Sequence, residues 1–111
     1  MPERYAFATR RLRARGWHAA GSVGAVDDLP AVVAAMLTEA VTRWLPPHWQ
    51  GPYTRARAET WIAEQDAEGI VLLVESRENG EPLGLILLFE EAVADGVDLR
   101  LGYLLAEHAW G

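Results

Sequence analysis

The sequence of 111 residues contains no cysteine and no lysine, and it has no apolar run long enough to cross a membrane. Without cysteine the chain has neither disulfides nor thiolate metal sites, and a reducing compartment suits it. A membrane-spanning helix needs about eighteen consecutive apolar residues, so we expect none. The N-terminus also lacks the apolar segment of a secretory signal. These absences predict a cytoplasmic protein without a membrane partner.

Half of the residues are hydrophobic and five are tryptophan, which is enough to build the core of one small domain. The net charge is −6, but residues 1–15 carry five arginines and one acid, whereas the rest of the chain carries five arginines and fifteen acids. An acidic body argues against nucleic acid as a partner and mildly favours an amine-bearing one. The simpler interpretation is ordinary surface charge that keeps the protein in solution.

We divide the chain into a basic arm, residues 1–14, and one domain, residues 15–111. Small residues and valines at 16–26 predict a first strand. From residue 27 to about 45, apolar residues recur at helical spacing behind an aspartate that can cap the first turn. We expect a single helix there.

Three prolines and a glycine predict a stiff loop at residues 45–53. Thr54 can cap a second helix that runs to about Ala67, and Gly69 is the expected stop. The inner face of this helix is expected to consist of Ala58, Trp61, Ile62 and Gln65.

From residue 70 onward the spacing of apolar residues changes from helical to extended. Residues 70–76 are apolar on both faces, which predicts an inner strand. Asn79-Gly80 predicts a two-residue hairpin turn into a strand at 82–91, and a looser connection at 92–97 leads to a third consecutive strand. The expected fold class is α/β (α+β), in the order β-α-α-β-β-β, ending in an antiparallel meander.

The end of the chain resembles a known family. A Gly-Tyr-x-Leu strand end is followed by Trp-Gly, at positions Gly102, Tyr103, Leu105, Trp110 and Gly111. The upstream loop adds Trp44, Leu45, Pro46, Trp49 and Trp61. Together these residues resemble the GCN5-related N-acetyltransferases (GNAT), in particular the branch of the ribosomal-protein N-terminal acetyltransferases. The resemblance runs from about Trp17 to the end of the chain and covers the N-terminal half of the family's fold.

The resemblance implies transfer of an acetyl group from acetyl-CoA to an amine acceptor. In this family the Trp-Gly pair precedes a glycine-rich loop and a helix whose N-terminal amides hold the pyrophosphate of acetyl-CoA. Gly111 would be the first residue of that loop. The chain alone is therefore expected to bind acetyl-CoA weakly or not at all, and to be inactive.

The resemblance also implies that the backbone of Leu104, Leu105 and Ala106 pairs with acetyl-CoA and offers an N–H to the developing oxyanion, usually near a bulge of the strand. Because these contacts use the backbone, the side chains of Leu104 and Leu105 can at the same time be core residues.

The base that removes the proton of the acceptor is harder to identify. Many relatives carry an acid two residues before the glycine of Gly-Tyr, where this chain has Arg100. Asp98 and Glu107 are weak candidates for this role, and His108 directly follows Glu107. Each is alternatively a solvated polar residue, and a base from the other half of the fold is equally possible.

The acceptor pocket implied by the resemblance is walled by the proline-rich loop. Its residues are Trp44, His48, Trp49 and Tyr53, with Arg100 from the strand. The alternative is a packing loop whose tryptophans cover the sheet. Three scattered histidines do not predict a metal site.

A different class of function remains open, that of a non-catalytic GNAT-like module. The family's fourth strand would have an unpaired edge in this chain, and an unpaired edge favours association with another chain. A homodimer or an exchanged strand is the expected form of that association.

Overall fold

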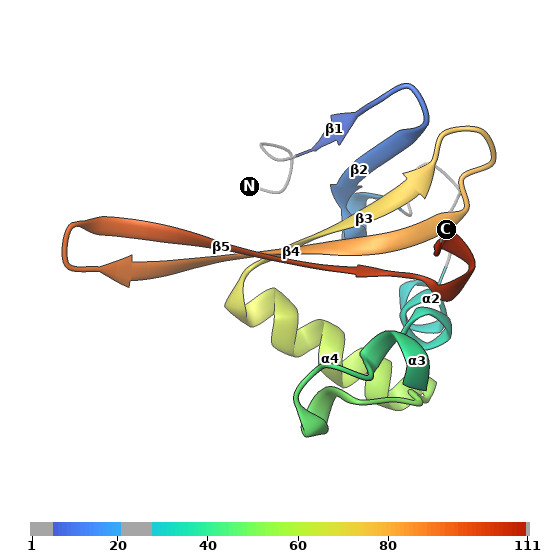
Figure 1. Ribbon diagram of the computed structural model, residues 1–111, viewed down its shortest axis with the longest axis horizontal. Coiled ribbons are helices and arrows are strands. Elements are labelled where there is room, and N and C mark those ends of the chain that lie inside the picture. The colour runs from blue at the N-terminus through green and yellow to red at the C-terminus, as the bar shows by residue number, and fades with distance from the viewer. Residues whose placement is uncertain (1–5, 21–27, 111) are drawn as a thin grey trace.

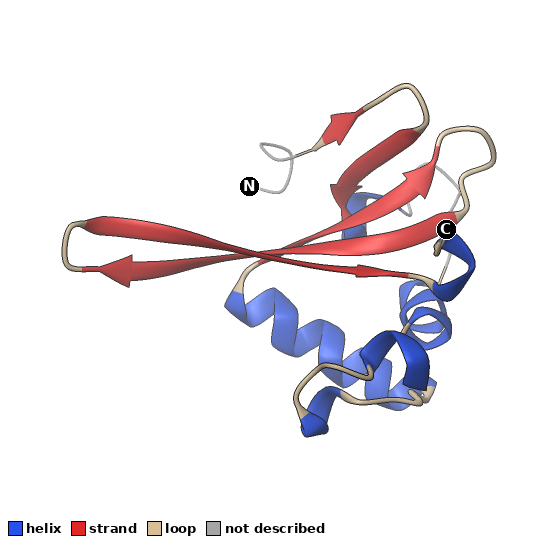
Figure 2. Ribbon diagram, in the orientation of Figure 1, coloured by secondary structure: helices blue, strands red, loops and turns tan. Residues whose placement is uncertain are grey.

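The computed structural model describes residues 6–20 and 28–110. Its five strands form one antiparallel sheet in chain order, and α2, α3 and α4 lie against one face of that sheet (Figure 1, Figure 2). The strands are β1 (Phe7–Ala8), β2 (Leu12–Gly16), β3 (Ile70–Ser76), β4 (Pro82–Val93) and β5 (Gly96–Leu105). The helices are α1 (Trp17–Ala20), α2 (Leu29–Met36), α3 (Glu39–Thr42) and α4 (Arg55–Glu68), with the 3-10 turns η3 (Pro47–Trp49) and η4 (Glu107–Ala109). The predicted α/β class and the C-terminal meander are confirmed.

The first strand lies earlier than predicted. β1 and the first three residues of β2 fall inside the stretch that we interpreted as a basic arm, and residues 17–20 form α1 instead of a strand. The remainder of the predicted strand, residues 21–26, lies outside the described residues. Arg13, from the predicted basic arm, and Arg15 approach the buried carboxylate of Glu75 on the neighbouring strand at 3.7 and 3.0 Å. Their charges have an internal partner, which is why a basic sequence forms a strand here.

The predicted long helix is broken into two. The Asp28 carboxylate caps α2 as expected and accepts a hydrogen bond from the N–H of Ala31 at 3.3 Å. The helix ends at Met36, and the hydroxyl of Thr38 caps α3 by accepting from the N–H of Val41 at 3.2 Å. A threonine hydroxyl that bonds the nearby backbone competes with the helical hydrogen bonds, and this accounts for the break.

The second predicted helix is confirmed as α4. Thr54 caps it by accepting from the N–H of Arg57 at 3.1 Å. Its buried residues are the predicted Ala58, Trp61, Ile62 and Gln65. Gly69 follows the helix in an extended conformation (φ −173°) and not in a left-handed one. Glycine stands here because a Cβ would collide with the backbone oxygen of Leu88.

Both hairpin connections differ from the predicted ones. The turn between β3 and β4 spans residues 77–80 and is closed by Ser76 N–H donating to the oxygen of Glu81 at 2.9 Å. Of the expected Asn79-Gly80 pair only Gly80 has a positive φ, 74°. The second connection is tighter than expected, because β4 continues to Val93 and β5 begins at residue 96. Longer strands leave only two residues for that turn.

The sheet has an apolar cluster on each face. Against α2 and α4 it packs the main core, which includes Val71, Leu73, Leu85 and Leu87. The opposite face has a smaller cluster of Ala14, Leu72 and Leu88. Beyond the core, β4 and β5 continue together as a two-stranded ribbon that projects from the molecule (Figure 1). Residues 90–101 of this ribbon are exposed. No helix in the described part of the chain is long and apolar enough to span a bilayer.

Candidate functional site

Among the described residues, the outer edge of β5 has no partner strand. β5 is the last strand in the described sheet and has a neighbour, β4, on one side only. In an antiparallel pair, alternate residues direct both backbone groups to the partner strand. The N–H of Ala106 donates to the oxygen of Leu83 at 2.8 Å, which places Ala106 and Leu104 in that set. The intervening residues direct their backbone groups outward. We call this outward row the β5 edge: Val97, Leu99, Leu101, Tyr103 and Leu105.

The three backbone positions predicted to contact acetyl-CoA are not equivalent. Leu104 packs against the main core and Ala106 is buried, and both bond toward β4. Leu105 alone turns its N–H outward, and its carbonyl oxygen accepts a hydrogen bond from the indole N–H of Trp110 at 3.1 Å. The pairing of β5 with β4 runs in constant register through Gly96–Leu105, without the bulge expected from the family.

A pocket of about 390 Å³ lies beside the end of β5, between α2, the start of β4 and η4. Its lining is largely apolar at the α2 side and polar at the η4 side. The residues are Val32, Ala35, Met36, Thr38, Glu81, Pro82, Ala106, Glu107 and His108. We call it the Glu107 pocket.

Two polar contacts lie on the polar side of the Glu107 pocket. The hydroxyl of Thr38 donates to the carboxylate of Glu107, which joins the α2–α3 break to η4. The imidazole of His108 lies 3.2 Å from a carboxylate oxygen of Glu81 at the start of β4. A carboxylate and an imidazole are thus held at the mouth of an apolar pocket, next to the end of the β5 edge. These are groups that can exchange protons with a bound amine.

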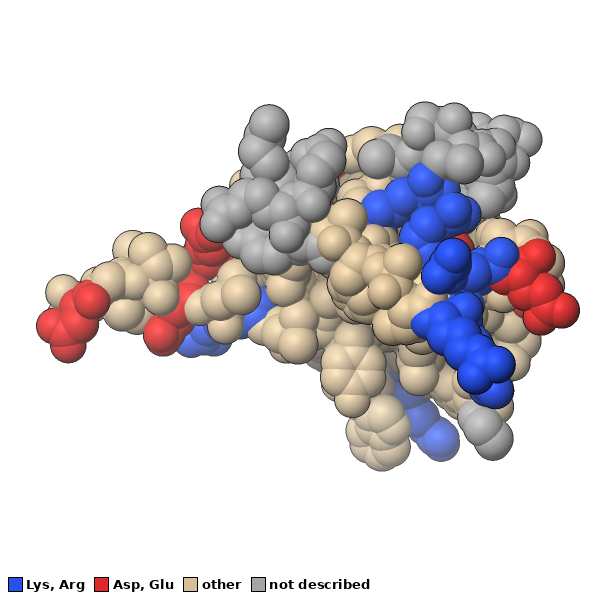
Figure 3. Space-filling view, turned by 90° about the horizontal axis from the view of Figure 1, so that it is seen from above, with Lys and Arg blue, Asp and Glu red and all other residues tan. Residues whose placement is uncertain are grey.

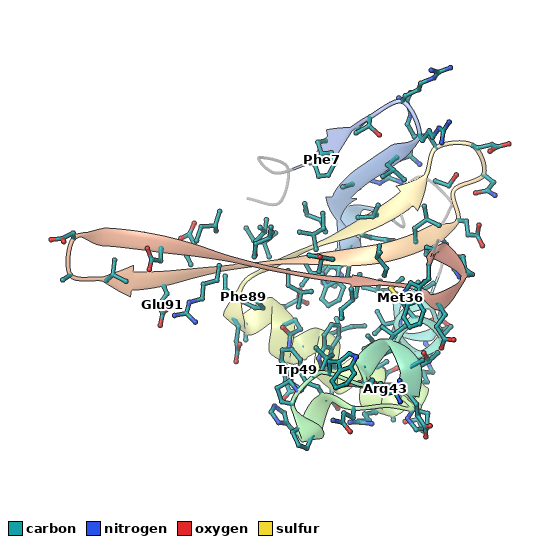
Figure 4. The ribbon with its side chains drawn as sticks, in the orientation of Figure 1. Phe7, Met36, Arg43, Trp49, Phe89 and Glu91 are labelled. Carbon is teal, nitrogen blue, oxygen red and sulfur yellow. The ribbon has the colours of Figure 1, made fainter. Side chains whose placement is uncertain are left out.

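The structure does not bring Asp98 or Arg100 to this pocket. Both lie on the exposed ribbon, and Asp98 is seven residues, about 23 Å of strand, away from Leu105. The guanidinium of Arg100 is paired with Glu91 across the ribbon at 2.6 Å. In Figure 4, Glu91 lies on the projecting ribbon, far from Met36 of the pocket. The geometry therefore leaves Glu107 as the candidate base that adjoins the pocket.

The aromatic loop divides into a packed part and an exposed part. Trp49 and Tyr53 meet the buried Trp61 edge-on, with ring centroids 6.0 and 6.4 Å apart. The hydroxyl of Tyr53 donates to the oxygen of Trp49 at 2.8 Å. Burial raises the pKa of Tyr53, and a nearby arginine opposes that rise. By contrast, Trp44 is 89% exposed and His48 is also exposed. The contacts of Trp49 and Tyr53 with Trp61 favour the alternative interpretation, in which this part of the loop packs against the core.

Two polar features of the structure were not predicted from the sequence, and one predicted site residue lies outside the described part of the chain. We predicted Thr38 inside a continuous helix, although threonine is a preferred N-cap residue and the acid Glu39 suits the first turn of a helix. The contact of Glu75 with Arg15 joins residues 60 positions apart, which no local pattern reveals. Gly111 lies outside the described residues. Among the described residues, no three histidine, aspartate or glutamate side chains are grouped in a way that could hold a metal ion.

Comparison with known proteins agrees with this architecture. No curated protein sequence matches the chain. A solved structure of a GCN5-related N-acetyltransferase from Brucella melitensis matches it with a TM-score of 0.64 at 20% sequence identity. The match covers 96% of this chain and 47% of that one, so this chain spans about half the length of the matched protein. The family model described as an acetyltransferase (GNAT) domain matches residues 23–111. The chain therefore belongs to the GNAT acetyltransferase family.

Proposed function

We propose that this chain is the acceptor-side half of an acetyl-CoA-dependent N-acetyltransferase, and that the end of β5 with the Glu107 pocket is its reaction site. The observation that carries the proposal is the position of a carboxylate beside an open strand edge. Glu107 stands at the mouth of an apolar pocket, two residues beyond the outward N–H of Leu105. Family membership supports acyl transfer in general.

The β5 edge fits the role of holding acetyl-CoA through its backbone. The amide arm of that molecule can add to a free strand edge as an extended peptide does. The outward groups at this end of β5 come from Tyr103 and Leu105, and the oxygen of Leu105 is already engaged by Trp110. Acetyl-CoA, when bound, supplies the acetyl thioester. The Leu105 N–H would stabilise negative charge on the acetyl oxygen.

Glu107 would remove the proton of the acceptor ammonium. The hydroxyl of Thr38 fixes the orientation of its carboxylate, and His108, paired with Glu81, stands next to it. The acceptor enters as an amine with an apolar body, because Val32, Ala35 and Met36 line the pocket. Once Glu107 has taken the first proton, the neutral amine nitrogen bonds to the acetyl carbon and the thioester C–S bond breaks. The sulfur leaves as the thiolate of coenzyme A and takes the second N–H proton, which leaves the neutral amide and free coenzyme A. The ribosomal-protein N-terminal branch and a cytoplasmic location are part of the same proposal.

Titration of the ¹⁵N-labelled chain with acetyl-CoA, followed by NMR, tests this assignment. Because the chain spans about half of its structural match, we expect weak binding with a dissociation constant of about 1 mM and little turnover. The shifts should gather at residues 103–110. Shifts that gather elsewhere, or none at millimolar ligand, would contradict the assignment. A micromolar constant would contradict the weak binding expected of this half.

One observation favours a second candidate function, that of a non-catalytic module. The β5 edge is apolar, unpaired in the described sheet and exposed over its whole length. A module of this kind would bind another chain through that edge and would not bind acetyl-CoA. The NMR titration separates the two functions, since only the acetyltransferase predicts ligand-dependent shifts at the end of β5.

A further inference from the structure

A second cavity adjoins the start of β4, on the side of β2 and β3. Its volume is about 840 Å³, and we call it the arginine pocket. The lining comes from the β1–β2 turn, the β3–β4 turn and the strand ends beside them, and none of it belongs to β5 or to the end of the chain. The residues are Arg10, Arg11, Leu12, Ser76, Arg77, Glu78 and Leu83.

The arginine pocket has an excess of positive charge. Three guanidinium groups and the carboxylate of Glu78 line it, a formal charge of +2 in a chain whose net charge is −6. Among the described residues, none of these three guanidinium groups is in an ion pair. Figure 3 shows arginine side chains gathered at the end of the molecule opposite the projecting ribbon. A pocket lined mainly by one sign of charge concentrates ligands of the opposite sign.

Hydrogen bonds between the two turns hold the arginines around the pocket. The guanidinium of Arg77 donates to the backbone oxygen of Thr9 at 2.8 Å, and the N–H of Arg77 donates to the oxygen of Arg11 at 2.9 Å. The first turn is closed on itself, because the N–H of Leu12 donates to the hydroxyl of Thr9 at 3.1 Å. A guanidinium has five N–H donors, so Arg77 keeps most of its donors for a ligand.

The rest of the lining offers one neutral donor and a small apolar surface. The Oγ of Ser76 accepts a hydrogen bond from the N–H of Glu78 at 3.3 Å, which leaves the Ser76 O–H to donate. Leu12 and Leu83 are the apolar residues of the lining, and both are half-buried. The pocket therefore suits an anion that is attached to a small organic group.

We propose that the arginine pocket binds a small molecule through a phosphate monoester group. This goes beyond the proposed function and does not depend on it. The fork of a guanidinium matches two phosphate oxygens, and a phosphate monoester carries about two negative charges at pH 7, which balances the charge of the lining. Leu12 and Leu83 contact the organic part. A nucleic-acid track is not favoured, because the chain beyond residue 15 carries five arginines against fifteen acids.

NMR titration of the ¹⁵N-labelled chain at constant ionic strength tests the class of ligand. The probe is phenyl phosphate, and phthalate is its matched control, because it is an aromatic dianion with carboxylates in place of the phosphate. We expect phenyl phosphate to bind with a dissociation constant of about 1 mM, and phthalate and inorganic phosphate to bind at least about fivefold more weakly. The shifts should gather at residues 10–12 and 76–83, whereas those proposed for acetyl-CoA gather at 103–110, so each proposal can fail without the other.

Three results of this titration would overturn the proposal. Phthalate that binds as tightly as phenyl phosphate would contradict the preference for phosphate. Inorganic phosphate that binds equally tightly would assign the pocket to the free ion and not to an ester. An absence of shifts at residues 10–12 and 76–83 with about 10 mM phenyl phosphate would exclude the site.

Charge variants test whether the pocket, and not the overall charge of the chain, holds the phosphate. Arg11→Gln removes one guanidinium from an exposed position of the lining and should weaken binding of phenyl phosphate about tenfold. Arg43→Gln is the matched control: it removes the same charge from an exposed position beside the helices, far from the β3–β4 turn (Figure 4), and should change binding less than twofold. Glu78→Gln removes the opposing carboxylate and should tighten binding about threefold. Equal losses in the two arginine variants, or weaker binding by Glu78→Gln, would overturn the proposal.

Discussion

The backbone oxygen of Leu104 lies 2.5 Å from the point where a Cβ on Gly84 would stand. Gly84 of β4 faces Leu105 in the sheet, so this glycine allows β5 to approach β4 closely just before the proposed reaction site. The close approach fixes the place of the Leu105 N–H.

Gly84→Ala should lower the free energy of unfolding by about 1–3 kcal/mol, because the end of β5 must shift to admit the methyl group. Gly102→Ala is the matched control, since nothing lies within 4 Å of a Cβ at that position. We expect it to be neutral or slightly stabilising. Urea denaturation of the two variants gives the comparison, and equal stabilities would contradict the close approach.

Arg15→Ala should cost about 3 kcal/mol of stability, because it removes the guanidinium 3.0 Å from the fully buried carboxylate of Glu75. Arg13 remains near that carboxylate and limits the loss. Arg10→Ala, at an exposed position, should change stability by less than about 0.5 kcal/mol. Chemical denaturation measures both. A loss for Arg15→Ala no larger than that for Arg10→Ala would mean that the pair does not support the β2–β3 contact.

The spacing of apolar residues predicted those helices and strands whose pattern and caps lie within one short segment of the chain. α4 and β3 matched because their apolar spacing and caps lie within one segment. β2 was missed because its strand character depends on Glu75, which is distant in sequence. The α2–α3 break was missed because Thr38 acts through a side chain in the middle of an apolar pattern.

From the sequence, the candidate site could be predicted only at the backbone positions that the family resemblance implies. Leu104, Leu105 and Ala106 could be named, but which of them faces outward follows from the register with β4. The sequence also weighed Asp98 and Glu107 equally, since both are acids near the same strand. Their separation along an extended strand, about 3.3 Å per residue, leaves only Glu107 beside the pocket.

Thr38→Val should destabilise the fold by about 1 kcal/mol through loss of the α3 cap. It also removes the hydroxyl that donates to Glu107, so the carboxylate should become more mobile. Thr38→Ser keeps both hydrogen bonds and is the control. Thermal unfolding reports the first effect and side-chain NMR relaxation of Glu107 the second. Identical behaviour of the Val and Ser variants would exclude this role of the hydroxyl.

The hydrogen bond from Arg55 holds the pKa of Asp28 below its ordinary value of 3.8. A lowered pKa in the folded state means that the contribution of Asp28 to stability is complete above pH 3.8 and is lost as the pH falls through the folded pKa. Carboxyl NMR titration should find this pKa below 3.8, and Asp28→Asn should remove that part of the acid sensitivity while keeping the cap of α2. Titration of Asp28 at or above 3.8 would refute the link between α2 and α4.

The outward N–H of Leu105 is the most direct test of the proposed acetyltransferase site. Leu105→Pro removes this N–H without removing a hydrogen bond to β4, whereas Leu105→Ala shortens the side chain and keeps the N–H. In NMR titrations with acetyl-CoA, we predict that the proline variant loses at least about tenfold in affinity and that the alanine variant binds nearly as the wild type does. Equal binding by the proline and alanine variants would contradict the assignment of acetyl-CoA to the β5 edge.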